Sequence, residues 1–353
     1  MAATTARRIL VEQVKARVFC SPNGGGGNPV TIFSTDQKLT AKIQKRLARS
    51  CDWESVILHR PVSKKPLFSF YMPSGGQVTF CAHAAMGAAY EMCRHQKPGD
   101  IDGTNFDVIF TVADLVDSGP SPAAAYTPQE YQASINSKDK IVRLKMETFY
   151  KQEMVSRPAL LSQVLREHCS TEKQDLLLGT EGTNFDDDIL SSCFHASIAR
   201  PKTLVPLKSR ELVNEKAVAP TSPDEFAQVC RDLDETTGLY LYAQLEDEEA
   251  TWECRQFPSA SGYPEDPATG IAAAALACHL KYQQKVDFET YKIYQGTAMG
   301  NPSLIVLENL DMRQRQDEND NGGVILDASF LLFGHVEIDG RVSFEIEDEI
   351  TGE

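Results

Sequence analysis

The sequence predicts an α+β protein built from two similar halves. The first observation is a polar turn at residues 262–270, followed at once by a helix of small and apolar residues at 271–280. The second is the same arrangement upstream, where residues 80–93 run from a strand through a tight turn into another small-residue helix. Helices this apolar are expected to be buried, one at the centre of each half. Because ligands commonly bind in clefts between domains, we expect the site between the halves.

Both turns place polar groups at a helix N-terminus. Glu265 and Asp266 are held between two prolines, Thr269 is expected to cap the helix, and Gly270 opens its first turn. In the upstream copy His83 lies in the first turn. The first amides of a helix are unpaired and its dipole is positive there, so each turn predicts an anion site.

The length of 353 residues predicts two domains. We expect an N-terminal domain at 1–139 and a C-terminal domain at 140–353, with the last strand able to pack back on the first domain. Residues 117–139 are rich in Ser, Pro and Ala, and are expected to form a surface insertion at the boundary. The chain is 42% hydrophobic and 24% charged, which indicates a globular protein with a substantial core.

The charge and cysteine content exclude several classes. A formal net charge of −15 argues against a nucleic-acid or anionic-membrane partner, and no apolar run approaches the length of a membrane span. The nine cysteines are scattered without metal-binding spacing, so no metal is expected. The first residues show no signal-peptide pattern, so we expect reduced thiols and a cytoplasmic protein.

The remaining elements follow apolar periodicity. In the first half the predicted strands are 14–19, 30–33, 56–59, 67–72, 78–80 and 108–115, with a helix at 39–50 and a loose leader at 1–10. In the second half the predicted strands are 141–148, 192–199, 204–207, 238–243, 251–257, 291–295, 303–307 and 332–348, with helices at 158–168 and 223–234.

Three loop features admit a functional and a structural interpretation. The four glycines Gly24 to Gly27 are not followed by a phosphate-binding lysine or a helix, so a flexible hairpin or lid loop is favoured. The acids at 186–188 lack the spacing of a calcium loop, which favours a solvated loop. Arg255 is expected to pair with an acid or with a ligand carboxylate.

Glu54 is the strongest candidate for proton transfer. It lies between a predicted helix and an apolar strand, beside Trp53. A carboxyl group in such a place is expected to have a raised pKa, which suits a proton carrier near neutral pH. A solvated turn glutamate is the alternative.

These motifs together resemble the PhzF-like isomerases of phenazine biosynthesis. The resemblance runs in family order from about residue 14 to the C-terminus, and Glu-Asp-Pro-x-Thr-Gly before a small-residue helix is its most specific part. The matching pieces are Gly27-Asn28-Pro29, Trp53-Glu-Ser-Val, Cys81-Ala-His-Ala-Ala, Arg255-Gln-Phe, Glu265-Asp-Pro-Ala-Thr-Gly270 and Gln295-Gly with Met299-Gly-Asn-Pro-Ser303.

The resemblance implies a diaminopimelate epimerase-like fold, in which each of two pseudo-symmetric domains wraps a mostly antiparallel sheet around a central helix. It also implies an isomerase without cofactor or metal, acting as a homodimer on a small carboxylate-bearing metabolite. Glu54 matches the residue that moves the proton, and His83 and Asp266 match residues that assist. The positions that match substrate contacts are Asn28, Cys81, Ala82, Gly270 and Ile271.

The sequence departs from the family pattern at three positions. Trp53 and Ile271 stand where serine is common, and Ala82 stands where glycine is usual. Loss of two hydroxyl groups predicts a more apolar pocket than in the phenazine enzyme.

Two other functions remain open. An epimerase of this fold would use two opposed thiolates; Cys81 could supply one, but Cys278 lies more than two turns into the second helix. A non-catalytic metabolite-binding or scaffold protein is the other alternative.

Overall fold

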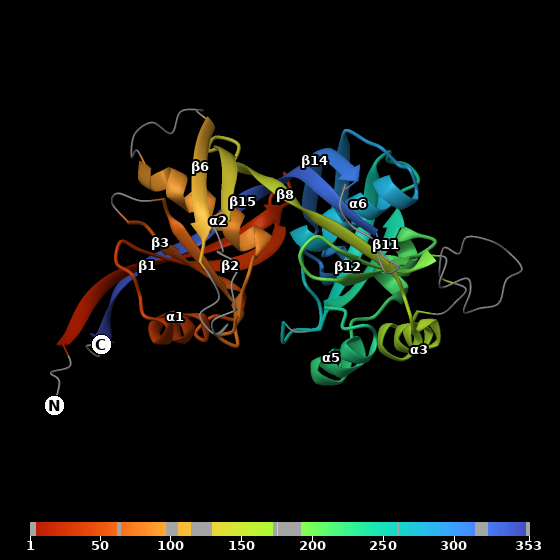
Figure 1. The fold of residues 1–353 in the computed structure, drawn as a ribbon, viewed down its shortest axis with the longest axis horizontal. Coiled ribbons are helices and arrows are strands. Elements are labelled where there is room, and N and C mark those ends of the chain that lie inside the picture. The colour runs from red at the N-terminus through yellow and green to blue at the C-terminus, as the bar shows by residue number, and fades with distance from the viewer. Residues whose placement is uncertain are drawn as a thin grey trace, which may run out of the picture. The chain divides into compact units, whose positions relative to one another are not determined.

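The computed structural model describes residues 5–61, 65–96, 105–113, 129–171, 175, 192–259, 261–314 and 324–350. Strands predominate over helices, as expected of an α+β protein (Figure 1). The chain divides into two compact units. The first unit is Met1–Val18, Pro29–Leu144 and His335–Glu353, and the second is Phe19–Asn28 and Lys145–Gly334.

The division of the chain differs from the sequence-based boundaries at Phe19–Asn28 and at His335–Glu353, which belongs to the first unit. The boundary between Leu144 and Lys145 lies close to the expected one after residue 139, but Phe19–Asn28 belongs to the second unit rather than the first. Its hydrogen bonds explain this. The Gly27 amide donates to Ser303 Oγ at 2.7 Å, and Asn28 Nδ2 donates to Asp266 Oδ1 at 2.7 Å.

The first unit is a mixed sheet around helix α2. Its strands pair β2 with β3 and β4 with β6 in parallel, and β3 with β4, β4 with β5 and β6 with β7 antiparallel. The bounds are β2 Gly26–Thr35, β3 Ser55–His59, β4 Leu67–Tyr71, β5 Gln77–Val78, β6 Asn105–Val112 and β7 Glu130–Asn136. Four long strands contribute residues to both units: β1 Thr5–Cys20, β2, β8 Ile141–Met154 and β15 Val324–Ile350.

Helix α2 (Ala82–Gln96) packs against β3, β4, β6 and β7. Its small residues allow this close approach, because a Cβ built at Gly87 would lie 3.1 Å from Val30 Cγ1. The prediction of a buried small-residue helix is therefore confirmed for α2 in this unit. Helix α1 (Ala41–Ala48) is amphipathic, and buries Ile43 and Leu47 in a separate apolar cluster.

The second unit repeats the plan around helix α6 (Gly270–Gln283), whose first eleven residues are all buried. Its strands follow the order β8-β9-β10-β11-β12-β13-β14-β15, with β10–β11 and β12–β13 parallel and the other pairs antiparallel. The bounds are β9 Phe194–Ser197, β10 Lys202–Pro206, β11 Gly238–Gln244, β12 Thr251–Pro258, β13 Thr290–Gln295 and β14 Ser303–Gln314.

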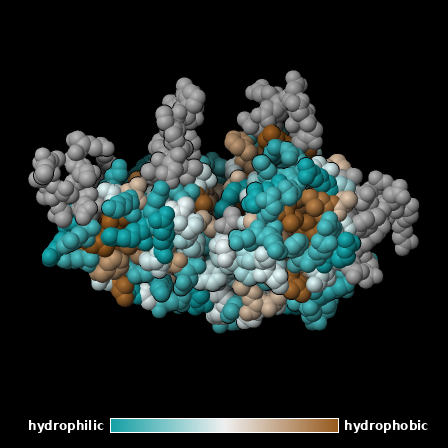
Figure 2. All heavy atoms as spheres, turned by 90° about the horizontal axis from the view of Figure 1, so that it is seen from below, coloured by the Kyte–Doolittle hydropathy of each residue, from teal (hydrophilic) through white to brown (hydrophobic). Residues whose placement is uncertain are grey.

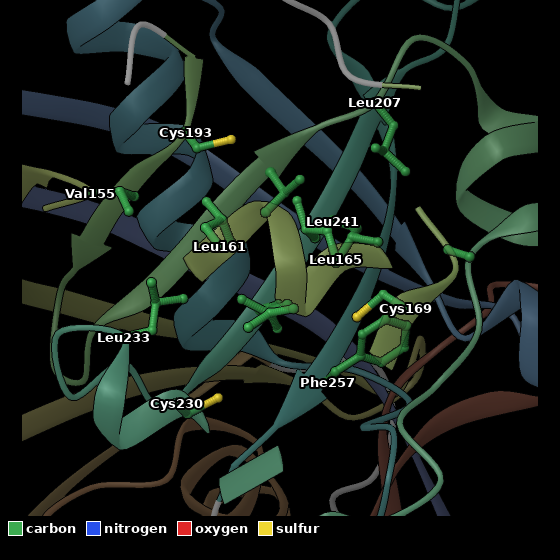
Figure 3. Packing of buried hydrophobic residues seen from close by; sticks show 14 of the residues in the cluster. Val155, Leu161, Leu165, Cys169, Cys193, Leu207, Cys230, Leu233, Leu241 and Phe257 are labelled. Atoms are coloured by element: carbon green, nitrogen blue, oxygen red, sulfur yellow. The ribbon is translucent and has the colours of Figure 1, made fainter. Parts of the chain in front are cut away.

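The opposite face of this second sheet carries its own apolar cluster. Helices α3 (Pro158–Cys169) and α5 (Pro223–Asp232) and the π-helix Leu212–Lys216 cover it. Figure 3 shows Leu161 and Leu165 of α3 near Leu241 and Phe257 of the sheet. With α6 on one face and these helices on the other, both faces of β11 and β12 are buried, which explains their continuously apolar sequences.

Two sequence expectations are wrong. Residues 5–10 of the expected loose leader belong to a strand, because β1 begins at Thr5. The insertion at 117–139 contains β7, whose alternate residues Tyr131, Ala133 and Ile135 are buried. Its Ser-, Pro- and Ala-rich surroundings conceal this short alternation in the sequence. Residues 114–128 and the acids at 186–188 lie outside the described residues.

The face of the molecule shown in Figure 2 is largely hydrophilic, with separate apolar patches. Among the helices that the structure describes, none combines the length and the apolar character needed to cross a membrane.

Candidate functional site

Glu54 immediately precedes strand β3, at the end of the turn that follows helix α1. Its backbone carbonyl accepts a hydrogen bond of 3.1 Å from the Thr31 amide, which attaches the residue to β2. The residue is 7% exposed, and the four residues that follow it are also buried. The carboxyl group is thus withdrawn from water, unlike that of a solvated turn glutamate.

Cys81 and His83 meet at the first turn of α2. Cys81 Sγ lies 3.5 Å from His83 Nδ1 and 3.8 Å from Nε2, and the two residues are 5% and 6% exposed. Ala82, between them, is the first residue of the helix. The three adjoining candidates of the first unit therefore form one buried group at a helix N-terminus.

In the second unit the Asp266 carboxylate is held by three hydrogen bonds. Oδ1 accepts from Asn28 Nδ2 at 2.7 Å and from the Ala268 amide at 3.3 Å, and Oδ2 accepts from Thr269 Oγ1 at 2.7 Å. Asn28 Nδ2 also donates to the Ala268 carbonyl at 2.6 Å. These contacts fix the carboxylate beside the N-terminus of α6. Asn28, which the resemblance implies as a substrate contact, donates to Asp266 in this structure.

Thr269 occupies the N-cap position of α6 but does not cap it with its side chain, contrary to the sequence expectation. Its hydroxyl donates to Asp266, while its carbonyl accepts from the amides of Ala272 and Ala273 at 3.1 and 3.0 Å. A side-chain cap would accept from a helix amide, whereas Thr269 Oγ1 accepts from Gln295 Nε2.

Gln295, on β13, forms hydrogen bonds with the turn that contains Asp266 and Thr269. Its Nε2 donates to the Asp266 carbonyl at 2.6 Å and to Thr269 Oγ1 at 3.1 Å. Its Oε1 accepts from the Thr269 amide at 3.1 Å and from the Tyr240 hydroxyl at 3.2 Å. The sequence motifs included Gln295 but gave it no role, and nothing in the sequence pointed to Tyr240, which lies on β11.

Glu265, the other acid of the Glu-Asp-Pro-Ala-Thr-Gly motif, forms an ion pair within the protein. Glu265 forms a bidentate ion pair with Arg255, at 2.9 Å to Nε and 2.7 Å to Nη2, and both side chains are buried. Arg255 Nη1 also donates to the carbonyls of Val213 and Ala217. The prediction that Arg255 pairs with an acid is confirmed, and its partner is a protein side chain.

Gly270 is needed for close packing. A Cβ at this position would lie 2.8 Å from Phe19 Cζ and 3.1 Å from Leu332 Cδ2. Phe19 is fully buried with a φ of 68°, which is rare for a bulky residue. Ile271, the next residue of α6, is 6% exposed.

The glycine-rich segment divides into two parts. Gly24 and Gly25 are exposed, and turn hydrogen bonds close the hairpin from Ser21 to Gly25. Gly26 and Gly27 are buried in β2, and a Cβ at Gly26 would lie 2.1 Å from the Pro302 carbonyl oxygen. The lid-loop hypothesis is therefore wrong for Gly26 and Gly27, which pack on the second Gly-Asn-Pro motif.

Within the described ranges, no cluster of three or more His, Cys, Asp or Glu side chains has the geometry of a metal site. The structure brings together Cys81, Ala82 and His83 in the first unit, which also contains Glu54, and Asn28, Asp266, Gly270 and Ile271 in the second. Each set surrounds the N-terminus of a buried helix.

Comparison with known proteins supports this description. The model of the phenazine biosynthesis-like protein family, PhzC-PhzF, matches residues 125–323, more than half of the chain. Trans-2,3-dihydro-3-hydroxyanthranilate isomerase of Pseudomonas chlororaphis is 44% identical over 55 residues, which are 15% of this chain and 20% of that enzyme. The match thus spans about a fifth of the length of the curated relative.

Solved structures share the fold across nearly the whole chain. A PhzF-family protein of Bacillus anthracis has a TM-score of 0.66 and 16% identity, covering 96% of this chain and 99% of its own. A predicted epimerase of Pseudomonas aeruginosa has a TM-score of 0.62 and 17% identity, covering 97% and 100%. A hydroxyproline epimerase of Agrobacterium vitis has a TM-score of 0.56 and 7% identity, covering 96% and 93%. These similarities confirm the predicted epimerase-like fold.

The family model covers both the Glu-Asp-Pro-Ala-Thr-Gly turn and Gln295, the residues that the hydrogen-bond network of the second unit joins. The expectation of an isomerase-type enzyme agrees with these matches. The chain belongs to the phenazine biosynthesis-like (PhzC-PhzF) protein family.

Proposed function

We propose that this protein is an isomerase that moves a proton between two carbons of a small carboxylate-bearing metabolite, without a cofactor. Glu54 is the general acid and base, and His83 and Asp266 assist. The substrate carboxylate binds at helix N-terminal amides, with Ala82 and Gly270 as the matching positions. The family supports the reaction class, and the burial of Glu54 is the observation that carries the choice of residue.

The buried Glu54 carboxyl suits this role for a physical reason. Removal from water disfavours the charged form of a carboxyl group, which makes it a better proton acceptor when ionised. A base whose pKa approaches the working pH is the most effective proton carrier. Glu54 would take a proton from one carbon and return it to another carbon of the same molecule, so the net reaction is an isomerisation.

The charge that develops on the substrate needs stabilisation. Loss of a carbon-bound proton next to a carboxylate gives an enolate-like anion, which hydrogen-bond donors and helix N-termini favour. Helices α2 and α6 each supply an N-terminus, with His83 at one and Asp266 at the other. The Asp266 carboxylate already accepts three hydrogen bonds, so its position is set before any substrate binds.

The test is incorporation of solvent deuterium, followed by mass spectrometry. The substrates are small carboxylates and amino acids, including trans-2,3-dihydro-3-hydroxyanthranilate, the compound named in the curated relative. Wild type is expected to exchange at least one compound, and Glu54→Gln to lose the exchange. Glu91→Gln is the matched control, because Glu91 is a fully buried glutamate of the same unit that pairs with Arg341. Exchange that survives in Glu54→Gln would overturn the assignment.

A thiol-dependent epimerase is the second candidate, favoured by the 3.5 Å contact between Cys81 Sγ and His83 Nδ1. Such an enzyme needs a second thiol. Cys278 is fully buried, and burial raises the pKa of its thiol. Cys81→Ala separates the two reactions: exchange that survives this substitution excludes the thiol mechanism, and exchange that disappears in it but survives in Glu54→Gln establishes it.

The homodimer implied by the resemblance also stays a proposal. Sedimentation equilibrium of the full chain would measure its mass directly, and a monomer at all concentrations would reject it. A non-catalytic scaffold would show no exchange with any compound, and Glu54→Gln would then change only local stability.

A further inference from the structure

The side-chain amide of Gln256 is buried and has no hydrogen-bond partner among the described residues, which is typical of a ligand-binding group. It is fully buried on β12, yet neither Oε1 nor Nε2 has a hydrogen-bond partner within the part of the chain that the structure describes. Buried amides are nearly always paired, because an unpaired polar group loses its bonds to water without replacement. Gln152, the buried glutamine of β8, is paired: its Oε1 meets Tyr150 Oη and lies 2.9 Å from His279 Nδ1.

The position of Gln256 places its amide beside Asp266. The two residues form an antiparallel bridge, in which the Asp266 amide donates to the Gln256 carbonyl at 3.0 Å. Directly opposed residues of such a pair point to the same side of the sheet, with Cβ atoms about 5 Å apart. The Gln256 side chain therefore lies on the face that carries the Asp266 carboxylate. Arg255, its neighbour in sequence, points to the other face and pairs with Glu265.

The polar groups next to Gln256 form their hydrogen bonds with other residues. Its cross-strand neighbour Tyr240 donates to Gln295, and the Asp266 carboxylate accepts from three other donors. On the other flank lies Gly238, where a Cβ would stand 2.7 Å from Gln256 Nε2. The missing side chain at Gly238 thus leaves room for the amide and offers it no partner.

A second unpaired atom adjoins the same carboxylate. Asn28 donates twice through Nδ2, but its buried Oδ1 has no hydrogen-bond partner among the described residues. Two buried amides next to Asp266 therefore hold one unused donor nitrogen, with two N–H groups, and two unused acceptor oxygens. A hydroxyl or an amino group, which both donates and accepts hydrogen bonds, matches this set.

We propose that the Gln256 side-chain amide binds a hydroxyl or amino substituent of the substrate beside Asp266, and so selects substrates that carry one. The proposal rests on the proposed function for the existence of a substrate at Asp266. It adds a specificity residue on β12. A site that hydrogen-bonds a hydroxyl or amino substituent binds an analogue without that substituent more weakly, because the polar groups of the protein then stay unpaired.

The variant Gln256→Met keeps the length of the side chain and removes both polar atoms. If the amide is paired only when a ligand is bound, the substitution removes an unpaired and therefore destabilising polar group from the ligand-free protein. We then expect the Tm of the variant to rise by about 2–4 °C. Gln152→Met is the matched control. It removes an amide that is already paired, so its Tm is expected to fall, with ligand selectivity unchanged. A fall in the Tm of Gln256→Met would mean that the amide stabilises the free protein, and would overturn the proposal.

Selectivity is measured by calorimetric binding in the Glu54→Gln background, where no turnover is needed. Two probe pairs differ by one hydroxyl: trans-2,3-dihydro-3-hydroxyanthranilate against its 3-deoxy analogue, and trans-4-hydroxy-L-proline against L-proline. We expect Gln256 to favour the hydroxylated member of at least one pair about tenfold, and Gln256→Met to abolish that preference.

The outcomes separate this proposal from the proposed function. Selective binding that depends on Gln256, without deuterium exchange in the wild type, would reject the isomerase and retain the Gln256 site. Deuterium exchange in the wild type, with equal binding of both members of each probe pair, would retain the isomerase and reject the Gln256 site. Wild-type protein that binds none of the four probes, or Gln256→Met that keeps the preference, overturns the Gln256 proposal.

Discussion

The Thr269 hydroxyl donates a 2.7 Å hydrogen bond to Asp266 Oδ2, and its oxygen accepts from Gln295 Nε2 rather than from an amide of the helix that it precedes. A residue with the sequence signature of an N-cap thus serves the carboxylate three positions earlier. Helix α6 still begins at Gly270, because the Thr269 carbonyl accepts its first internal hydrogen bonds. The turn and the helix are therefore stabilised by different atoms of one residue.

Thr269→Val should reveal this bond. Valine keeps the shape of threonine but removes the hydroxyl, which deprives Asp266 Oδ2 of its donor and should destabilise the protein by about 1–3 kcal/mol. A carboxylate that loses a donor has a higher pKa, so the pH profile of exchange should also shift upward. Thr269→Ser retains the hydroxyl and should restore both properties. A valine variant with wild-type stability and pH profile would contradict the assigned bond.

The ion pair between Arg255 and Glu265 should be costly to break from one side. Both side chains are buried, at 7% and 6% exposure, so Arg255→Met leaves an uncompensated carboxylate and should destabilise the protein by about 3–5 kcal/mol. Urea unfolding measures the loss. The double variant with Glu265→Met should recover part of it, because no unpaired charge remains. Additive losses in the double-mutant cycle would show that the two residues act independently.

His279 makes stability dependent on pH. It is 1% exposed on α6, and burial lowers its pKa to about 4 from the usual 6.5. Between these values the unfolded chain binds a proton that the folded protein does not. The free energy of unfolding should therefore rise with pH from about 4 to 6.5, and fall by about 3 kcal/mol as the pH drops through this window. His279→Gln removes the titrating group.

The variant His279→Gln should show a flatter dependence of urea unfolding on pH across that window, compared with wild type. His335→Gln provides the comparison, since that histidine lies on β15 in the other unit. An unchanged slope in His279→Gln would assign the acid sensitivity to other groups.

Gly270→Ala should overpack the start of α6. The new Cβ would lie 2.8 Å from the Phe19 ring, so the ring or the helix must move, and overpacking of this kind costs about 1–3 kcal/mol. Exchange activity should fall with it, because the helix N-terminus shifts. Gly340→Ala is the control, since a Cβ there meets nothing within 4 Å. Thermal unfolding should show a clear difference between the two variants, and equal melting temperatures would contradict the predicted contact.

The amino-acid sequence by itself determined the plan of this protein. Two helices of small apolar residues, each preceded by a polar turn, were expected to be buried, and the structure contains one such helix in each unit. Alternating and continuous apolar runs located most strands, because side-chain periodicity reflects which faces are buried. Arg255 was expected to pair with an acid or with a ligand carboxylate, and the structure shows the pair with Glu265.

The tertiary structure alone decided which polar groups meet. Asn28 and Asp266 are separated by 238 positions, and Tyr240, Gln256 and Gln295 belong to three different strands. Sequence periodicity shows which face a residue occupies but not which distant residue shares that face. The role of Thr269 was mistaken for the same reason, because local spacing predicts that its oxygen accepts from a helix amide, whereas the fold brings Gln295 Nε2 within reach of that oxygen.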